Sequence, residues 1–443
     1  MNEPPSVPAA APFDRFLTIR LLPLYICIAA FLVRFVCIIC CEYHLCSDAA
    51  EFWKIARNII AGKGFLLNGL PTAYRMPGFP GVLALFGFAS DNMVWLRSVL
   101  ALCEVATGVF IYLLGKEHFG RKPAIVAFAV WSLLPISVVQ PLLFLSEGLF
   151  TALFMALLLV VIRPASLRTT VIGGLLCGLL ILVKQHMLLF PAVFAAVLLV
   201  RREQPGVVLK HLFIFSVIAA VTVVPWAIRN KHHFGAYTLS TNGGQNLYIG
   251  NNPSATGSYY NLPPEMYPPV GKEMESDGVL KKQAVSYIIH NPVAVMKTVP
   301  KKIAFLFSLE SASVILLHFK GCMPGGVSYR DAFRQTPLWS HVLFSLPYII
   351  IVLAAVWAMW LLSGQSLLLK SIIVIMLFWT GIHALYFGAS RFHYPLLPLM
   401  ALAASAFFER FPIIFTRGRT IGALVVSCGF ISVWGAELLM AYR

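Results

Sequence analysis

The sequence predicts an all-α polytopic membrane protein, that is, a chain that crosses a bilayer many times as helices. Of its 443 residues, 59% are hydrophobic and only 12% are charged, and the mean hydropathy is +0.81. This composition excludes a soluble globular protein. The apolar residues fall into runs of roughly 17 to 25 residues, which is the helix length that crosses about 30 Å of hydrocarbon.

About eleven membrane-spanning helices are expected, together with amphipathic helices beside the membrane and a small extracytoplasmic domain. The expected spans are residues 16–41, 94–115, 123–140, 143–162, 169–184, 186–200, 208–228, 341–362, 368–387, 393–408 and 418–439. The apolar stretch 303–318 is short, and counting it as a crossing would place the basic residues of the later loops outside. We therefore expect this stretch to enter and leave the membrane on one face.

Composition divides the chain into four regions. Residues 1–15 are expected to be a disordered cytoplasmic tail, and residues 16–229 an N-terminal transmembrane module with its first external loop at 42–92. Residues 230–302 are rich in Asn, Gly, Pro and Tyr, which predicts a small extracytoplasmic domain. Residues 303–443 form the expected C-terminal transmembrane module.

The net charge of +16 follows the pattern of a membrane protein and not that of a nucleic-acid-binding protein. Lysines and arginines gather in short connections between apolar runs, as at 116–122 and 201–202. Cytoplasmic loops carry such an excess of positive charge, and some of it faces anionic membrane lipids. Nucleic-acid binding would need a basic face on a soluble domain, and the sequence offers none.

The nine cysteines form no metal or redox motif. Most lie in expected spans, where cysteine behaves as a small apolar residue. Cys40, Cys41 and Cys46 lie close to the end of the first span, so a disulfide could form there, but no CxxC spacing supports a zinc or redox site. The sequence requires no cofactor, and it leaves the question of a divalent metal open.

The longest polar segment in the first half of the chain lies at 46–80. A helix is expected to begin beside Asp48, because apolar residues recur with a helical period from Phe52 to Ile60. Its two faces suit a helix lying in the plane of a membrane surface. Arg75 follows in a turn stiffened by Pro and Gly. We expect Asp48 and Arg75 to meet in one pocket.

Ionisable side chains gather on the outer face that this topology predicts. They are Asp48, Arg75, Glu147, Lys184, His186, Arg229, Lys301, Lys302, Arg391 and His393. The cations among them need an explanation, because the positive-inside rule places few cations on this face. A lipid substrate that carries a phosphate at the membrane boundary supplies one, since Arg side chains bind phosphate oxygens with favourable geometry.

Several motifs along the chain together resemble one family of membrane enzymes. They are SDAAEFW, PTAYRMPGFP, LSEGLF, TNGGQNLYIGNNP and SRFHYPLLP. Their order and spacing resemble bacterial integral-membrane glycosyltransferases of the GT-C superfamily, in the branch that contains protein O-mannosyltransferases and the lipid A aminoarabinose transferase. The resemblance covers nearly the whole chain.

The resemblance implies roles for particular residues. Asp48 matches the family's catalytic aspartate in the first external loop, and Arg75 matches the cation that binds lipid phosphate. Arg391 matches the basic residue of a late motif, and Glu147 resembles an acidic residue at the outer end of an early span.

The chain departs from the family pattern at two places. Ala49 follows Asp48 where protein mannosyltransferases usually have a second acid, and the nearest other carboxylate is Glu51. Phe392 stands where tyrosine is commoner. The first departure argues against protein mannosylation and against a metal site built from two acids.

The expected function is transfer of a sugar, a hexose or a pentose, from a polyprenyl phosphate to a lipid, glycan or protein acceptor. Asp48 would act as general base, and inversion at the anomeric carbon is expected from a single displacement. The expected contacts to substrate and lipid phosphate are Arg75, Arg391, Tyr74, Glu147, Lys184, His186, Arg229, Lys302 and His393. The expected location is the inner or plasma membrane, with the active site facing the periplasm or the exterior.

Simpler structural roles are alternatives for several of these residues. Asp48 is also a suitable helix N-cap, with Glu51 three residues later. Glu147 and Lys184 could pair with each other, and Arg229 could anchor its helix at the membrane interface.

Two other functions are alternatives for the whole chain. A transporter or flippase for lipid-linked sugars would need charged residues along a route through the bilayer and internal symmetry, and the sequence shows few such charges and no repeat. A polysaccharide polymerase or ligase shares a large outer loop with arginines. Such an enzyme uses a diphosphate-linked oligosaccharide and need not depend on an acid at Asp48.

Overall fold

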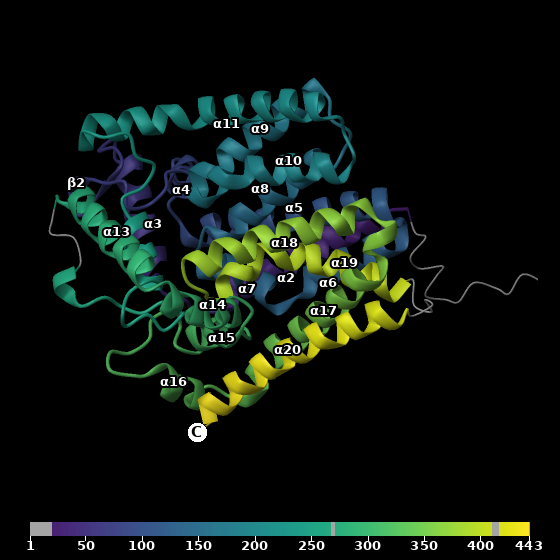
Figure 1. Ribbon diagram of the computed structural model, residues 1–443. Helices are drawn as coiled ribbons and strands as arrows, with labels where there is room; N and C mark the ends of the chain where they lie inside the picture. The colour runs from purple at the N-terminus through teal and green to yellow at the C-terminus, as the bar shows by residue number, and fades with distance from the viewer. Residues whose placement is uncertain (1–19, 267–270, 410–415, 443) are drawn as a thin grey trace, which may run out of the picture.

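The structure is a computed structural model, and it describes residues 20–266, 271–409 and 416–442. The expected tail at 1–15 lies outside these residues. The described part is a bundle in which long helices run side by side, and shorter helices collect at one end (Figure 1). The strands of this part are β1 (Leu66–Leu67) and β2 (Leu70–Pro71), which pair antiparallel. The all-α prediction is confirmed.

The first half of the chain folds into closely packed helices. They are α2 (Leu22–Cys40), α3 (Ser47–Ile60), α4 (Gly78–Gly87), α5 (Met93–Phe119), α6 (Arg121–Leu133), α7 (Pro135–Leu143), α8 (Glu147–Val161), α9 (Leu167–Val183), the 3₁₀ helix η1 (Gln185–Leu189), α10 (Phe190–Val200) and α11 (Pro205–Phe234). α5 packs against α2, α6 and α8, and α9 packs against α11. Large buried side chains such as Trp131 and Phe154 fill the interior and fix these helices in place.

The second half begins with short helices at the end of the bundle and returns to long ones. The elements are α12 (Gly243–Gly250), η2 (Pro264–Met266), α13 (Glu273–His290), α14 (Pro292–Leu306), α15 (Ser311–His318), α16 (Tyr329–Gln335), α17 (Leu338–Leu362), η3 (Ser363–Gln365), α18 (Leu367–Leu385), η4 (Ser390–Leu396), α19 (Leu397–Glu409) and α20 (Arg417–Tyr442). α12 packs against α13, and α17 packs against α19 and α20. α3 and α13 to α15 all lie at the same end of the bundle (Figure 1).

Among the described residues, six helices are long and apolar enough to cross a membrane, namely α2, α5, α11, α17 with η3, α18 and α20. A seventh crossing is counted if the bent pair α6 and α7 forms one span. The expected spans 143–162, 169–184 and 186–200 correspond to the shorter apolar helices α8, α9 and η1 with α10. The chain is therefore an integral, multi-pass membrane protein. The expected count of eleven crossings stays a prediction.

The expected span at 123–140 is bent in the structure. α6 ends at Leu133, α7 begins at Pro135, and the helices differ in direction by 48°. Leu134 adopts φ −60° and ψ 120°, because a residue that precedes proline avoids the helical conformation. α7 ends at Leu143, and the φ of +55° at the next residue, Phe144, turns the chain sharply before α8 begins at Glu147.

The segment 303–318 leaves and returns to the same end of the bundle. Lys302, just before it, donates to Asn251 Oδ1 of the segment between α11 and α13 at 3.0 Å. Lys320, just after it, pairs with Glu42, which lies between α2 and α3. These contacts are those expected of a stretch that enters and leaves on one face.

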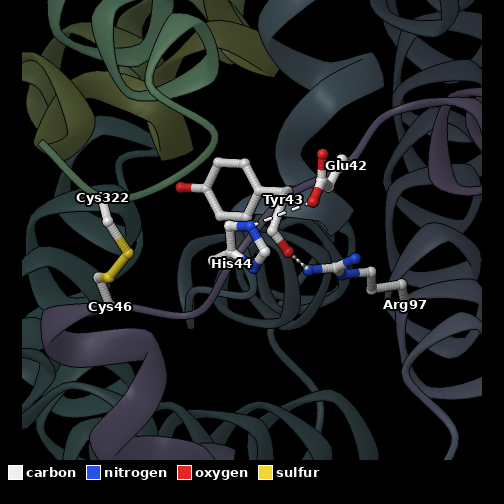
Figure 2. The surroundings of a disulfide bond; sticks show 6 residues. All are labelled: Glu42, Tyr43, His44, Cys46, Arg97 and Cys322. Carbon is white, nitrogen blue, oxygen red and sulfur yellow. Dashed lines mark hydrogen bonds and ion pairs between the residues drawn. A yellow bond between two sulfur atoms is a disulfide. The ribbon is translucent and has the colours of Figure 1, made fainter.

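A disulfide joins Cys46 to Cys322 (Figure 2). A disulfide therefore does form near the end of the first span, but the partner of Cys46 is Cys322, and Cys40 and Cys41 are free thiols. The true partner of Cys46 lies 276 residues away, so proximity along the chain could not reveal it.

Further contacts fasten the chain beside this disulfide. His44 N donates to Lys320 O at 2.8 Å, and the Arg97 guanidinium donates to Tyr43 O at 2.7 Å. Figure 2 shows the Arg97 contact a few residues before Cys46. The start of α3 is thus attached both to the connection between α15 and α16 and to α5.

Removing the disulfide should lower the thermal stability of the protein. A disulfide typically stabilises a fold by about 2–4 kcal/mol, mainly by restricting the unfolded chain. We expect Cys322→Ser and Cys46→Ser to lower the midpoint of thermal unfolding by the same amount. Cys40→Ser removes a free thiol and should leave the midpoint unchanged. Equal midpoints for all three variants and the wild type would contradict this expectation.

Candidate active site

A cavity of about 840 Å³ lies where α3, α8, η1, α13 and η4 meet. Its ionisable lining residues are Asp48, Arg75, Glu147, Lys184, His186, Asp277, Lys281, His383 and Arg391. Apolar side chains such as Phe52, Trp379 and Phe392 line much of the remainder. The cavity therefore combines an apolar surface with a few convergent charged groups, as ligand sites commonly do.

α3 places Asp48 at this cavity. Phe52 and Ile55 are buried on one face of the helix, so their packing fixes how the helix is rotated about its axis. The N-cap residue of α3 is Cys46, and no side-chain cap is formed. The alternative interpretation of Asp48 as a helix cap is therefore wrong, because its carboxylate is directed to other partners.

Asp48 bridges two guanidinium groups that come from distant parts of the chain. Its Oδ1 lies 2.5 Å from Arg75 Nη2, and its Oδ2 lies 2.8 Å from Arg391 Nη1. Arg75 Nε also donates to Glu51 Oε2 at 2.7 Å. The side chain of Asp48 is 23% exposed and that of Arg391 is 42% exposed, so the cluster is reachable from the cavity. Arg391 uses one of its five N–H donors on Asp48, which leaves donors free for a bound anion.

The two cations keep Asp48 ionised. Burial alone would raise the pKa of this carboxyl, but the charges of Arg391 and Arg75 outweigh burial and hold the pKa well below its ordinary range. The reciprocal effect holds the pKa of Arg75 above its usual value. In the absence of substrate, Asp48 is therefore a carboxylate at every physiological pH.

The Asp48 ion pairs should contribute to stability throughout the neutral range. Because the folded-state pKa lies below the unfolded value of about 3.9, the contribution is complete above that value and is lost as pH falls below it. We expect the difference in unfolding midpoint between the wild type and Asp48→Asn to stay constant down to about pH 5 and to shrink below about pH 4. A difference that already shrinks near pH 7 would contradict this assignment.

η4 presents Arg391 to the cavity and is anchored on both sides of the bundle. Trp379 Nε1, on α18, donates to Phe392 O at 2.7 Å. Tyr394 OH donates to Glu104 Oε2, on α5, at 2.7 Å, and both side chains are buried. These bonds hold the residues that follow Arg391. The backbone position from which the Arg391 side chain extends is therefore fixed.

His393 provides a third anchor for η4. Its Nδ1 lies 2.7 Å from Leu306 O, and its Nε2 lies 2.9 Å from Glu310 Oε1. The side chains of His393 and Glu310 are 0% and 2% exposed. Both ring nitrogens are therefore engaged inside the protein.

Glu147 and Lys184 face the same cavity and pair with each other. Lys184 Nζ donates to Glu147 Oε1 at 2.9 Å, and both residues line the cavity. One of the three ammonium protons of Lys184 is used in this bond. The His186 ring packs edge-on against Trp379 with centroids 5.0 Å apart, and its Nε2 is buried without a bond to any described residue.

Comparison with known proteins identifies the fold. A family model described as dolichyl-phosphate-mannose-protein mannosyltransferase matches residues 80–228. The oligosaccharyltransferase of Archaeoglobus fulgidus in its apo form is 13% identical, and the match covers 94% of this chain and 55% of that chain with a TM-score of 0.53. In its fold, this chain is similar to the GT-C superfamily. The resemblance seen in the motifs is confirmed at the level of the fold.

Two further solved structures are similar to this chain. AglB from Archaeoglobus fulgidus, in complex with an inhibitory peptide and a dolichol-phosphate, is 12% identical, covers 96% of this chain and 55% of its own, and has a TM-score of 0.51. ArnT from Cupriavidus metallidurans, bound to undecaprenyl phosphate, is 13% identical, covers 88% and 78%, and has a TM-score of 0.45. The chain spans about half the length of the archaeal enzymes. Comparison with curated protein sequences gives no significant match.

Four expected substrate contacts do not line the cavity, namely Tyr74, Arg229, Lys302 and His393. Tyr74 OH donates to Gln245 Oε1 at 3.1 Å, and its ring lies 5.1 Å from the Arg75 guanidinium carbon. Lys302 is buried, and its ammonium bonds to Asn251. These side chains connect the elements around the cavity.

Arg229 holds the β1–β2 hairpin that precedes Arg75. Its guanidinium donates to Thr72 O at 2.7 Å and to Phe65 O at 2.9 Å. It also lies 4.9 Å from the centroid of the Trp226 ring. These bonds give Arg229 a structural role. That role is to hold the hairpin, which differs from only anchoring α11 at the membrane interface.

The described residues do not fit a divalent metal at this site. Both oxygens of Asp48 are bonded to guanidinium groups, and Glu51 faces Arg75. No group of three His, Cys, Asp or Glu side chains in the described ranges could hold a metal ion. Any chemistry at this site is therefore assigned to the protein's own side chains.

Two acidic residues make contacts beside the site that the sequence analysis did not predict. Glu51 lies one helical turn after Asp48, a spacing that predicts a shared face. Glu273, on α13, accepts from Ala73 N at 2.6 Å and from Thr72 Oγ1 at 2.9 Å. Glu273 lies about 200 residues after this turn, and nothing in the local sequence indicates the contact.

Proposed function

We propose that this chain is a glycosyltransferase that takes a sugar from a polyprenyl phosphate at the extracytoplasmic face of the membrane. The observation that carries the proposal is the carboxylate of Asp48, bridged by the guanidinium groups of Arg75 and Arg391 at a cavity beside membrane helices. A lipid-linked donor would keep its chain in the bilayer and bring its phosphate to this cluster.

The proposed phosphate contacts are Arg75, Arg391 and Lys184. Each has N–H donors beyond those bonded to carboxylates, and charge-assisted bonds to phosphate are strong. AglB, which shares the fold, is described in complex with a dolichol-phosphate, which supports a lipid phosphate as ligand. Glu147 and His186 would line the space for the sugar and the acceptor.

In the proposed reaction, an acceptor hydroxyl oxygen attacks the anomeric carbon of the donor sugar. The bond between that carbon and the phosphate oxygen breaks, and its electron pair leaves with the phosphate. Asp48 takes the hydroxyl proton, while the cations stabilise the charge that grows on the leaving phosphate. A single displacement of this kind inverts the anomeric configuration.

Donor binding would also prepare Asp48 for its role. The resting carboxylate is a weak base, because the nearby guanidinium charges hold its pKa low. A phosphodiester that shares Arg75 and Arg391 brings a negative charge close to Asp48, and a neighbouring negative charge raises a carboxyl pKa. The base would therefore become stronger when the donor is in place.

The disulfide supports an extracytoplasmic site. Cys46 lies two residues before Asp48 and is bonded to Cys322. Disulfides persist in oxidising compartments and are rare in the cytosol. The inner or plasma membrane, with this end of the bundle facing the periplasm or exterior, satisfies that requirement.

The transporter alternative gains no support from the buried charges in the spans. Arg34 donates to Ala30 O and Ser132 O, and Glu104 accepts from Tyr394 OH. Neither Arg34 nor Glu104 lines the cavity. Both groups are bonded to neighbouring residues within the helix bundle. They therefore do not mark a route for a lipid-linked sugar through the bilayer.

The direct test is incubation of the purified protein with a panel of polyprenyl phosphate sugars, both hexoses and pentoses. We expect at least one donor to release free polyprenyl phosphate when a membrane extract supplies the acceptor. A folded protein that releases none from any donor would contradict the proposal.

A further inference from the structure

The cavity has a second wall that the Asp48 cluster does not form. This wall comes from α13, from α12 and from the segment that leads into α12. It carries Tyr237, Ser240, Asn242, Asn246, Asp277 and Lys281. Its one carboxylate and one ammonium balance each other. The other wall, formed around Asp48, has three cations suited to phosphate, namely Arg75, Arg391 and Lys184. The second wall instead offers amide groups, a hydroxyl group, and one carboxylate and one ammonium whose charges cancel.

The Asp277 carboxylate has a fixed position in the second wall. Its Oδ1 accepts from Gly244 N at 2.6 Å and from Gln245 N at 3.3 Å, so the first turn of α12 holds the carboxylate in place. No described residue bonds to Oδ2, and Asp277 lines the cavity. Burial also raises the pKa of Asp277. One oxygen is thus held by the protein and the other is left for a ligand.

The contact between α12 and α13 depends on a glycine. A Cβ at Gly244 would lie 2.1 Å from Asp277 O, which is far closer than two such atoms can approach. Gly244 therefore lets the start of α12 reach the carboxylate. The wall is a built surface and not a chance grouping of side chains.

The two asparagines extend the hydrogen-bonding surface around Asp277. Asn242 Oδ1 accepts from Ser240 Oγ at 2.8 Å, which leaves its amide N–H groups as donors. Asn246 lies one turn later and also lines the cavity. Tyr237 adds an aromatic ring that is 72% exposed. Together they offer acceptors, donors and an aromatic face within one surface.

We infer that this wall is the acceptor subsite and that it takes a neutral saccharide, an inference that rests on the proposed function. Sugar hydroxyls both donate and accept, so they match a carboxylate beside amides, and the apolar face of a pyranose ring packs on an aromatic ring. A peptide bound as an added strand would need a free strand edge. The strands of the described residues are two residues long and pair with each other.

α13 also connects the two walls. Glu273, one turn before Asp277, accepts from Thr72 and Ala73 in the turn that delivers Arg75. The helix that holds the acceptor thus also holds the loop that binds the donor phosphate. A saccharide bound at Asp277 would therefore sit at a fixed position relative to Arg75.

Saturation-transfer NMR on the protein in nanodiscs tests the inference without any donor. The probes are a mixture of neutral methyl pyranosides and, separately, a neutral peptide that contains Ser and Thr. We expect transfer to the saccharides in the wild type, and at least a tenfold weaker signal in Asp277→Asn. The amide oxygen of the substituted side chain can still accept the two backbone N–H bonds, so α12 should keep its place. Lys282→Ala, an exposed change on the same helix, is the matched control and should leave the signal unchanged.

Three results would overturn the inference: no saccharide signal in the wild type, a signal that Asp277→Asn does not weaken, or a peptide signal that Asp277→Asn removes. Failure of the proposed function would give a different set of results. In that case the saccharides bind through Asp277, and yet no polyprenyl phosphate is released from any donor. If donors are turned over while Asp277→Asn leaves the KM for a saccharide acceptor unchanged, the function stands and the acceptor subsite is wrong.

Discussion

Asp48→Asn should abolish sugar transfer while the protein stays folded and still binds lipid phosphate. Asparagine keeps the size of the side chain and one hydrogen-bond acceptor for the guanidinium groups, but it cannot take a proton. Loss of a general base typically lowers the rate by roughly 10²- to 10⁴-fold. The measurement is the rate of polyprenyl phosphate release at saturating donor, together with the unfolding midpoint.

Glu51→Gln is the matched control for this substitution. Glu51 lies on the same helix and pairs with the same Arg75, yet Asp48 alone touches both guanidinium groups. We expect Glu51→Gln to lower the rate far less than Asp48→Asn does. Near-normal turnover by Asp48→Asn, or equal losses in both variants, would remove the base assignment.

Arg391→Ala should weaken binding of undecaprenyl phosphate by about 10- to 100-fold. A hydrogen bond to a charged group contributes about 1.5–3 kcal/mol, and each 1.4 kcal/mol is a factor of about ten in the dissociation constant. Arg391→Lys keeps the charge but loses the planar fork, so an intermediate affinity is expected. Titration of undecaprenyl phosphate into the purified variants measures the effect.

Lys301→Ala provides the control for this loss of charge. Lys301 is an exposed cation on α14 that does not line the cavity. Its removal changes the net charge by the same amount and should leave the dissociation constant within about twofold, because exposed charges contribute little. A similar loss of affinity in Lys301→Ala and Arg391→Ala would mean that general electrostatic attraction, and not the Asp48 cluster, binds the phosphate.

Local sequence patterns predict the helices well and their breaks less well. The helical period from Phe52 to Ile60 predicts α3 because its buried face is a local property. The long apolar runs likewise predict α5, α11 and α17. The bend at Leu134 was missed because an apolar run shows no change in composition there, although Pro135 is the physical signal.

The parts of the site that join distant segments are beyond the reach of sequence patterns. Asp48 and Arg75 could be paired because both lie in one short polar segment. The contacts of Cys46 with Cys322, and of Glu273 with the turn before Arg75, depend on how the helices pack. The contact of Glu51 with Arg75 could have been predicted, since Glu51 lies one turn after Asp48.

Counting charges on the outer face does not distinguish cavity-lining side chains from those that hold the fold together. Arg229, Lys302 and His393 bond to backbone carbonyls or buried polar side chains and do not line the cavity. Polar groups away from water need such partners. Arg391 differs because it keeps free donors at the cavity.

A structure of the protein with bound undecaprenyl phosphate is the most direct test of whether the Asp48 cluster binds the donor phosphate. We expect a phosphate oxygen within about 3.2 Å of a guanidinium nitrogen of Arg391 or Arg75, in the cavity that Asp48 lines. A phosphate held elsewhere, with the Asp48 cluster unchanged and out of reach, would contradict this expectation.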